Sequence, residues 1–100
     1  MKKINMTPVF KRWYNGLKDN KGKIAINARI FRVEQYGHFG DCRRISEKVY
    51  EMRIFSGPGY RVYCMKKGEE IVILLAGGDK STQEKDIKTA IALSKEIKWW

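Results

Sequence analysis

The chain has 100 residues, of which 21 are Lys or Arg, 11 are Asp or Glu and 43% are hydrophobic. This composition predicts one domain over residues 1–100, with no room for a second. The longest apolar run, Ile71–Ala76, is far shorter than the roughly 20 residues that cross a bilayer. The basic start Met1–Lys3 is not followed by a secretory signal pattern, so we expect a cytoplasmic protein without a membrane segment.

Cysteine and histidine are too scarce for the common zinc and disulfide scaffolds. Cys42 and Cys64 stand alone in the sequence, and the chain has one histidine. That pattern excludes a CxxC-type zinc site and a disulfide framework. We therefore expect two free thiols, no metal ion and no cofactor.

The formal net charge is +10, and it is unevenly distributed. Residues 1–40 carry nine positive and two negative side chains, whereas residues 68–100 carry five positive and six negative ones. A cationic surface of this size predicts a polyanion, such as nucleic acid or the ribosome, or an acidic protein partner. A basic protein without such a partner remains the alternative at this point.

The first forty residues predict two helices. Thr7 is a favourable N-cap, and Pro8 suits the first helical position. The apolar side chains that follow have the spacing of one helix face: Phe10, Trp13, Tyr14 and Leu17. A second helical pattern sets Ile26, Ile30 and Val33 on one face with Arg29 and Arg32 beside them, and it stops near Tyr36–Gly37. We expect these helices to form a hairpin.

From Cys42 the period changes to two. Residues 49–55 and 60–65 alternate around the turn Ser56–Gly59, and residues 71–76 form an apolar strand buried on both faces. Short stretches at 2–5 and 41–45 are candidates for further strands. A capping box of Ser81 and Glu84 starts a last helix. The predicted order, (β)ααββββα, is an α+β domain: a helical hairpin on a mainly antiparallel sheet of three to five strands, then a C-terminal helix.

Alternation predicts a polar cluster on the sheet. Glu51 and Arg53 fall on the same face as Arg61 and Tyr63 of the next strand, and Lys80 follows the central strand. Two guanidinium groups, an ammonium group, a carboxylate and a phenol would form a groove suited to phosphate. The alternative is a solvated sheet face on which Glu51 pairs with an arginine.

Three segments of the sequence carry the pattern of a known family: Val49–Arg53, Gly57–Tyr63 and Leu74–Gln83. They resemble the RelE/ParE superfamily, and most closely the HigB-like addiction module killer proteins, and the resemblance extends over nearly the whole chain. It implies the RelE-like fold and a bacterial type II toxin. Such a toxin is a ribosome-dependent, metal-independent endoribonuclease that cleaves messenger RNA and inhibits translation.

The resemblance also implies partners and residue roles. The partners are the ribosome, messenger RNA and a cognate antitoxin, of helix-turn-helix type by superfamily habit; alone, the protein is expected to be a monomer. The resemblance maps catalytic roles onto Arg53, Arg61 and Lys80, and the position of Glu51 beside them on the predicted sheet face adds it as a further expected catalytic residue. The residues expected to bind RNA are Arg53, Arg61, Tyr63, Lys80, Arg29 and Arg32. For Arg29 and Arg32, contact with an acidic antitoxin segment or a solvated basic face stays open.

Two other functions fit the same fold. A ParE-like protein would inhibit DNA gyrase without cleaving RNA, because a fold does not fix its function. An inactive binding module, acting as a partner in gene regulation, would cause no growth arrest. The arginines on the sheet favour the nuclease.

Overall fold

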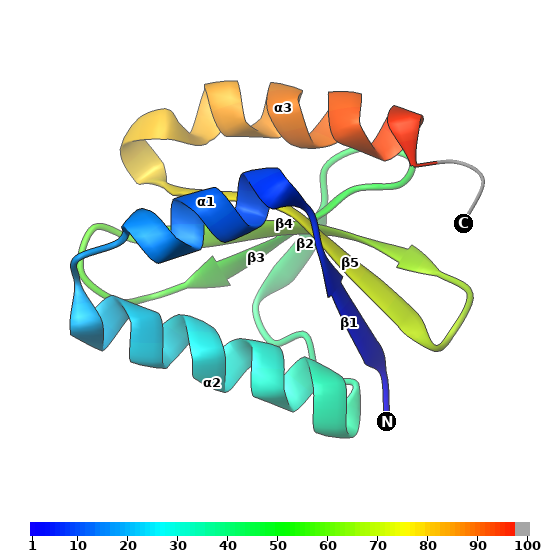
Figure 1. Ribbon diagram of the computed structural model, residues 1–100, viewed down its shortest axis with the longest axis horizontal. Helices are drawn as coiled ribbons and strands as arrows, with labels where there is room; N and C mark the ends of the chain where they lie inside the picture. The colour runs from blue at the N-terminus through cyan, green and yellow to red at the C-terminus, as the bar shows by residue number, and fades with distance from the viewer. Residues whose placement is uncertain (98–100) are drawn as a thin grey trace.

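The computed structural model describes residues 1–97, with three α-helices around one five-stranded sheet (Figure 1). The elements are β1 (Lys3–Met6), α1 (Pro8–Gly16), α2 (Asn20–Tyr36), β2 (Cys42–Arg44), β3 (Tyr50–Ile54), β4 (Tyr60–Lys67), β5 (Ile71–Asp79), the short 3₁₀ helix η1 (Lys80–Thr82) and α3 (Gln83–Glu96). This order confirms the predicted α+β class and both short strands. No helix among the described residues is long and apolar enough to cross a membrane.

The sheet has the strand order β1-β5-β4-β3-β2. Strands β2 to β5 are antiparallel neighbours in chain order, in agreement with the predicted, mainly antiparallel sheet. The first strand is parallel to β5, with Lys3 opposite Ile71. Parallel neighbours need a long crossover connection, and the helices α1 and α2 lie within that connection.

Side-chain caps begin the first two helices, and the cap of α1 also joins that helix to the sheet. The Thr7 hydroxyl accepts a hydrogen bond from the Phe10 N–H at 3.1 Å and donates one to the Leu75 carbonyl at 2.6 Å. Asp19 caps α2 by accepting from the Gly22 N–H at 3.1 Å. The helix ends at Gly37, whose φ of 70° lies in the left-handed region that glycine tolerates.

Helices cover both faces of the sheet. The α1 and α2 side encloses a core that includes Phe10, Ile26, Met52 and Val62. In Figure 1, α3 runs along the opposite side, where Ala90 packs against the second core. That core holds Val49, Tyr63, Met65, Ile73, Leu75 and Ala76. The face that carries the predicted polar cluster is therefore partly buried by α3 rather than fully solvated.

A bulge in β5 comes just before two glycines, which lie on opposite faces of the sheet because successive residues of a strand alternate. Tyr63 pairs with Ala76 but Cys64 pairs with Leu74, so Leu75 is an extra residue in β5. After the bulge, Gly77 lies against the Trp13 ring, and Gly78 lies against the Asp86 carboxylate. A Cβ atom at either position would overlap these groups. The glycines therefore let α1 and α3 approach the strand closely.

The start of α3 differs from the prediction. Ser81 is not an N-cap paired with Glu84. Instead the Asp79 carboxylate caps η1, accepting from the Ser81 N–H at 2.8 Å and from its hydroxyl at 2.5 Å. Thr82, which precedes α3, makes no capping bond with its side chain. The earlier carboxylate forms the cap, and a 3₁₀ turn is inserted before the helix.

Replacement of Gly77 by Ala is expected to lower the free energy of unfolding by about 1–3 kcal/mol. The new Cβ would lie 2.2 Å from Trp13 Cε3, and the indole is held by Phe10 and Tyr60 at ring distances of 5.7 and 6.1 Å. Urea unfolding measures the loss. The control is Gly16→Ala, where the space is open and helix propensity predicts no loss. Equal stability of the Gly77→Ala variant and the wild type would contradict this packing.

Candidate functional site

The polar residues predicted to share a sheet face do lie together. Arg53 is directly opposite Arg61, and Glu51 is directly opposite Tyr63. Arg53, Arg61 and Lys80 line one cavity at the end of the β3–β4 hairpin. The structure thus brings together residues from two neighbouring strands and from η1.

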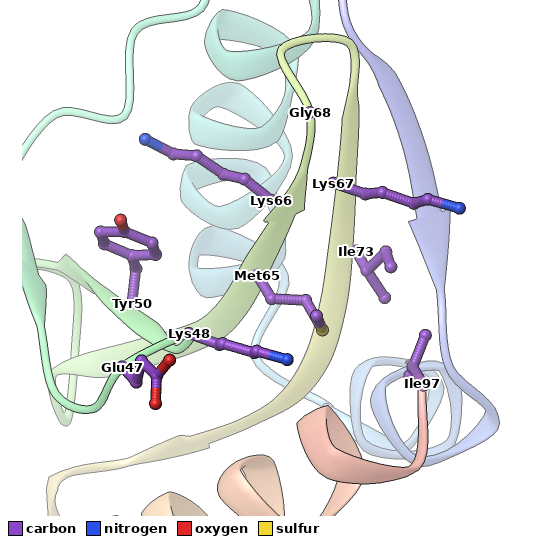
Figure 2. A pocket seen from close by; sticks show the side chains of 9 residues that line it. All are labelled: Glu47, Lys48, Tyr50, Met65, Lys66, Lys67, Gly68, Ile73 and Ile97. Carbon is purple, nitrogen blue, oxygen red and sulfur yellow. The ribbon is translucent and has the colours of Figure 1, made fainter. Parts of the chain in front are cut away.

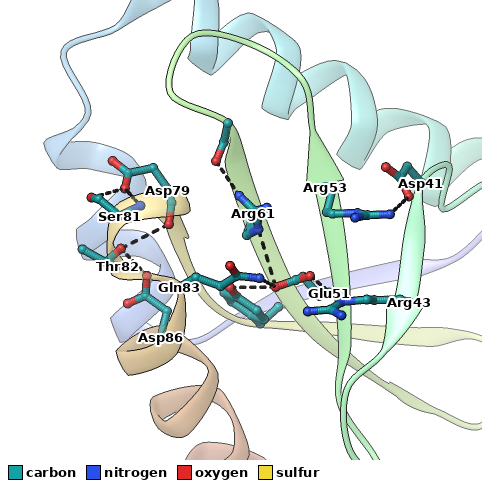
Figure 3. Close-up of polar contacts among 12 residues, drawn as sticks. Asp41, Arg43, Glu51, Arg53, Arg61, Asp79, Ser81, Thr82, Gln83 and Asp86 are labelled. Atoms are coloured by element: carbon teal, nitrogen blue, oxygen red, sulfur yellow. Dashed lines mark hydrogen bonds and ion pairs between the residues drawn. The ribbon is translucent and has the colours of Figure 1, made fainter.

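Glu51 is the centre of a buried polar network (Figure 3). Its side chain is 0% exposed. Its carboxylate accepts hydrogen bonds from Arg43 Nε at 2.9 Å, the Tyr63 hydroxyl at 3.0 Å and Gln83 Nε2 at 2.9 Å. Arg61 Nε lies 3.7 Å from the same carboxylate. One carboxylate therefore ties β2, β4 and α3 to β3.

The ionisation of this network follows from its contacts. Burial by itself raises the pKa of Glu51, but the hydrogen bonds from Gln83, Arg43 and Tyr63 outweigh it, so the pKa is lowered from its ordinary value. Burial and the neighbouring Glu51 charge raise the pKa of Tyr63. Glu51 thus stays ionised near neutral pH and Tyr63 stays protonated, which makes Glu51 a weak proton acceptor.

The expectation that Tyr63 binds RNA is contradicted by its position. The side chain is 0% exposed and its hydroxyl donates to Glu51. Alternation placed Tyr63 on the correct sheet face, but α3 covers that part of the face. Its role is to hold the buried carboxylate.

Arg61 is held so that part of its guanidinium lines the cavity. Its side chain is 13% exposed. Nη1 donates to the Gly59 carbonyl at 3.0 Å, whereas Nε is buried and has no hydrogen-bond partner among the described residues. The Glu51 charge on one side and the Gly59 carbonyl on the other fix the orientation of this cation before any ligand arrives.

Arg53 is more open and already has a partner. Its Nη2 lies 2.9 Å from Asp41 Oδ1, and its side chain is 39% exposed. Asp41 precedes the edge strand β2, and no feature of the sequence points to this pair. The ion pair anchors Arg53 at the edge of the cavity and offsets part of its charge.

The structure does not bring Arg29 and Arg32 into the site. Arg29 donates to the backbone carbonyls of Phe39 at 3.0 Å and Arg53 at 2.8 Å, so it fastens α2 to the segment before β2 and to β3. Burial lowers the pKa of Arg29. Arg32 is exposed on α2, which packs on the other side of the sheet. In this structure Arg29 has a structural role, and its expected contact with RNA stays a prediction.

Lys80 is the exposed cation of this cavity. It lies in η1, directly after β5, and its side chain is exposed. The preceding Asp79 accepts hydrogen bonds from Ser81, and these lower its pKa below the usual value. This local cap holds the short helix that carries Lys80 to the cavity.

The cavity itself has a volume of about 280 Å³. Its walls combine three cationic side chains with the hairpin turn and two aromatic residues: Arg53, Arg61, Lys80, Phe55 and Tyr60, with Ile54, Gly57, Pro58 and Gly59. Within residues 1–97, no three His, Cys, Asp or Glu side chains are grouped as metal ligands. The arrangement is suited to an anion, because arginine and lysine donate charge-assisted hydrogen bonds to phosphate oxygens.

A second cavity, of about 320 Å³, lies at another end of the sheet (Figure 2). Its walls include Lys48, Lys66 and Lys67 around an apolar base of Met65 and Ile73. Lys66 also lies over the rings of Phe39 and Tyr50 at 4.6 and 4.7 Å. None of the predicted site residues lines it, so the basic surface is divided between two places.

Two residues of the site escaped the sequence prediction. Gln83 and Arg43 both donate to Glu51, but they are 32 and 8 residues from it in the chain. The alternating pattern relates only neighbouring strands, so it could not pair Glu51 with a residue of α3. Arg43 lies in the short strand expected at 41–45, and a register for that strand would have suggested the contact.

Comparison with known proteins agrees with this architecture. The family model described as phage derived protein Gp49-like (DUF891) matches residues 13–97. The chain belongs to the Gp49-like family. This is a family of RelE/HigB-type addiction toxins, so the predicted superfamily is confirmed. An uncharacterized protein of Haemophilus influenzae (strain Rd) is 48% identical over 94 residues, which are 94% of each chain.

Two solved structures show the same fold. The toxin–antitoxin complex RelBE of E. coli contains a chain that matches with a TM-score of 0.65 and 14% identity, covering 79% of this chain and 96% of that one. A free E. coli toxin RelE with two arginines replaced by alanine matches with a TM-score of 0.64 and 13% identity, covering 85% and 93%. The predicted RelE-like fold is confirmed.

Replacement of Glu51 by Gln is expected to lower the free energy of unfolding at pH 7 by about 1–3 kcal/mol, because buried donors lose their charged acceptor. Folding lowers the pKa of Glu51. Its contribution is therefore complete above the pKa of the unfolded chain and is lost as pH falls through the lower pKa of the folded protein. Urea unfolding from pH 7 to pH 3 should show the difference between the two proteins shrinking.

The control for this series is Glu70→Gln, because Glu70 is exposed in the turn between β4 and β5. Its stability should follow that of the wild type at each pH. A difference between wild type and Glu51→Gln that stayed constant down to pH 3 would contradict the assigned ionisation.

Proposed function

We propose that this protein is a type II toxin that cleaves messenger RNA on the ribosome without a metal ion, and that a cognate antitoxin silences it. The observation that supports this most directly is Arg61, held between Glu51 and the Gly59 carbonyl with part of its guanidinium on the cavity. Arg53 and Lys80 add two cations to the same cavity. Family membership supports the toxin role.

The chemistry needs little more than orientation and positive charge. RNA carries its own nucleophile: the 2′-hydroxyl gives its proton to solvent water, and its oxygen attacks the adjacent phosphorus. The bond from phosphorus to the 5′ oxygen breaks, and that oxygen takes up a proton, leaving a 2′,3′-cyclic phosphate and a 5′-hydroxyl. Donors already aimed at the phosphate stabilise the added negative charge without reorganisation.

We assign phosphate binding and charge stabilisation to the three cations of the cavity. Arg61 binds the scissile phosphate, since its planar guanidinium can donate to two oxygens. Arg53 binds the phosphate from the edge of the cavity. Lys80, exposed and carrying three N–H donors, stabilises the developing charge or protonates the 5′ oxygen.

Glu51 is assigned to positioning rather than to proton transfer. It is buried and ionised and accepts three hydrogen bonds. It therefore holds Arg61, and in this proposal the surroundings of the RNA align the 2′-hydroxyl. The ribosome provides these surroundings. A small cavity on the protein is then sufficient, because it needs to bind only the phosphate.

The antitoxin is proposed from the fold and from the charge. A structure of similar fold is the intact RelBE toxin–antitoxin complex of E. coli. The net charge of +10 favours an acidic segment of a partner, because opposite potentials steer association and set specificity. We therefore propose a heteromer with an antitoxin that lowers access to the cations of the cavity.

Replacement of Arg61 by Ala is expected to reduce messenger cleavage at least about 100-fold, as removal of a preorganised transition-state donor does. The assay is primer extension on a defined messenger in a reconstituted translation reaction, with and without chelator. Lys88→Ala is the matched control, because it removes the same charge from an exposed position on α3 and should cleave normally. Thermal unfolding should show that both variants are folded, because Glu51 keeps three hydrogen bonds in the Arg61→Ala variant.

Other outcomes of this assay discriminate the alternatives. An intact messenger with wild-type protein that still arrests growth would overturn the nuclease proposal, and inhibition of gyrase supercoiling would then identify a ParE-like activity. Absence of growth arrest would favour a binding module. Cleavage that needed a divalent ion would overturn the metal-independent step.

A further inference from the structure

One aromatic side chain beside the cations is left in solvent. Phe55 follows β3 and is 80% exposed, more than any other large apolar side chain of residues 1–97 except Met1. The exposed rings of Phe31 and Tyr36 contact each other at 6.4 Å. Within residues 1–97, Phe55 has no such ring contact and no cation over its face. Its large apolar surface therefore has no partner within the described fold.

Strand alternation explains why Phe55 points away from the core. Ile54 is 4% exposed and packs on the α1 and α2 side, so its neighbours Arg53 and Phe55 face the other way. The Phe55 ring is one of the walls of the cavity that Arg53, Arg61 and Lys80 line. An apolar ring and three cations thus share one small space.

The turn that shapes this cavity is fixed from behind. The Tyr60 hydroxyl donates to Asp19 at 2.8 Å, and Asp19 also caps α2. Burial and this contact raise the pKa of Tyr60 to about 12, so the hydroxyl remains a donor at neutral pH. The Gly59 N–H donates to the Ser56 carbonyl at 3.0 Å and closes the turn. Phe55 therefore adjoins a turn that these two hydrogen bonds hold in place.

Gly59 keeps space open between the cations. Its φ is +81°, and a Cβ atom there would lie 3.6 Å from Arg61 Nη1 and 4.0 Å from the Lys80 Cβ. A side chain at this position would project between the two residues that are proposed to hold phosphate. The open space therefore suits a ligand that places an anion between Arg61 and Lys80 and an apolar ring near Phe55.

We propose that Phe55 forms a nucleobase-stacking subsite next to the phosphate site, so that the cavity binds one unpaired nucleotide of the RNA by both its base and its phosphate. This inference rests on the proposed function and names how that site recognises its substrate. Bases of single-stranded RNA stack on exposed aromatic side chains, and this contact is tolerant of sequence. The acidic side chain of a protein ligand would use the cations but would not need the ring.

The test measures stacking directly on the ribosome. A messenger is placed in programmed ribosomes with 2-aminopurine in the A-site codon and 2′-O-methyl groups that block cleavage, and quenching of the fluorescence is followed as protein is added. Wild type and Phe55→Tyr should quench it. Phe55→Leu, which keeps an apolar side chain without the ring, should lose the quenching and bind roughly 5- to 150-fold more weakly. Phe31→Leu, at the exposed phenylalanine of α2, is the matched control and should behave as wild type.

The outcomes separate this subsite from the proposed function. Absence of quenching by wild type, or equal quenching by Phe55→Leu, would overturn the subsite, even if an unmodified messenger is still cleaved. If the wild-type protein failed to cleave the unmodified messenger, the proposed nuclease activity would be overturned, but the quenching of 2-aminopurine fluorescence by stacking could still be observed. Loss of antitoxin binding by Phe55→Leu with unchanged quenching would show that the ring contacts a protein, and would overturn the inference.

Discussion

A single buried carboxylate organises the functional end of this fold. Burying an ionised group is costly unless charge and hydrogen bonds compensate it. Glu51 meets that requirement with donors from β2, β4 and α3. Each donor belongs to a different element, so the carboxylate holds these elements at fixed positions around the cavity. The same interaction orients Arg61, and thereby couples the packing of α3 to the geometry of the proposed phosphate site.

Local patterns in the sequence were sufficient for most of the fold. Alternation in residues 49–55 and 60–65 predicted that Arg53 and Arg61 share a sheet face, because a period of two assigns each residue to one face. The structure sets them directly opposite each other. Thr7 and Pro8 predicted the start of α1 for an equally local reason. The predicted start of α3 was wrong because Asp79, two residues before Ser81, accepts the hydrogen bond from the Ser81 N–H.

Side-chain partners were less predictable than strands. Tyr63 and Arg53 fall on the same face by alternation, yet α3 covers Tyr63 and leaves Arg53 open. That difference depends on where a distant helix crosses the sheet, partly through the bulge at Leu75. Arg29 likewise carries the charge of a nucleic-acid contact but donates to backbone carbonyls. Residue type and periodicity contain no information on such contacts, which join segments far apart in the chain.

The parallel pairing of β1 with β5 has a consequence for biosynthesis. Lys3 pairs with Ile71, so β1 cannot pair until β5 has been synthesised. Contacts between residues so far apart in the sequence form slowly. Gln83, which completes the shell around Glu51, emerges later still. A nascent chain therefore cannot assemble its cationic cavity until almost all of it has left the exit tunnel. The order of synthesis itself delays the appearance of an active toxin beside the ribosome that makes it.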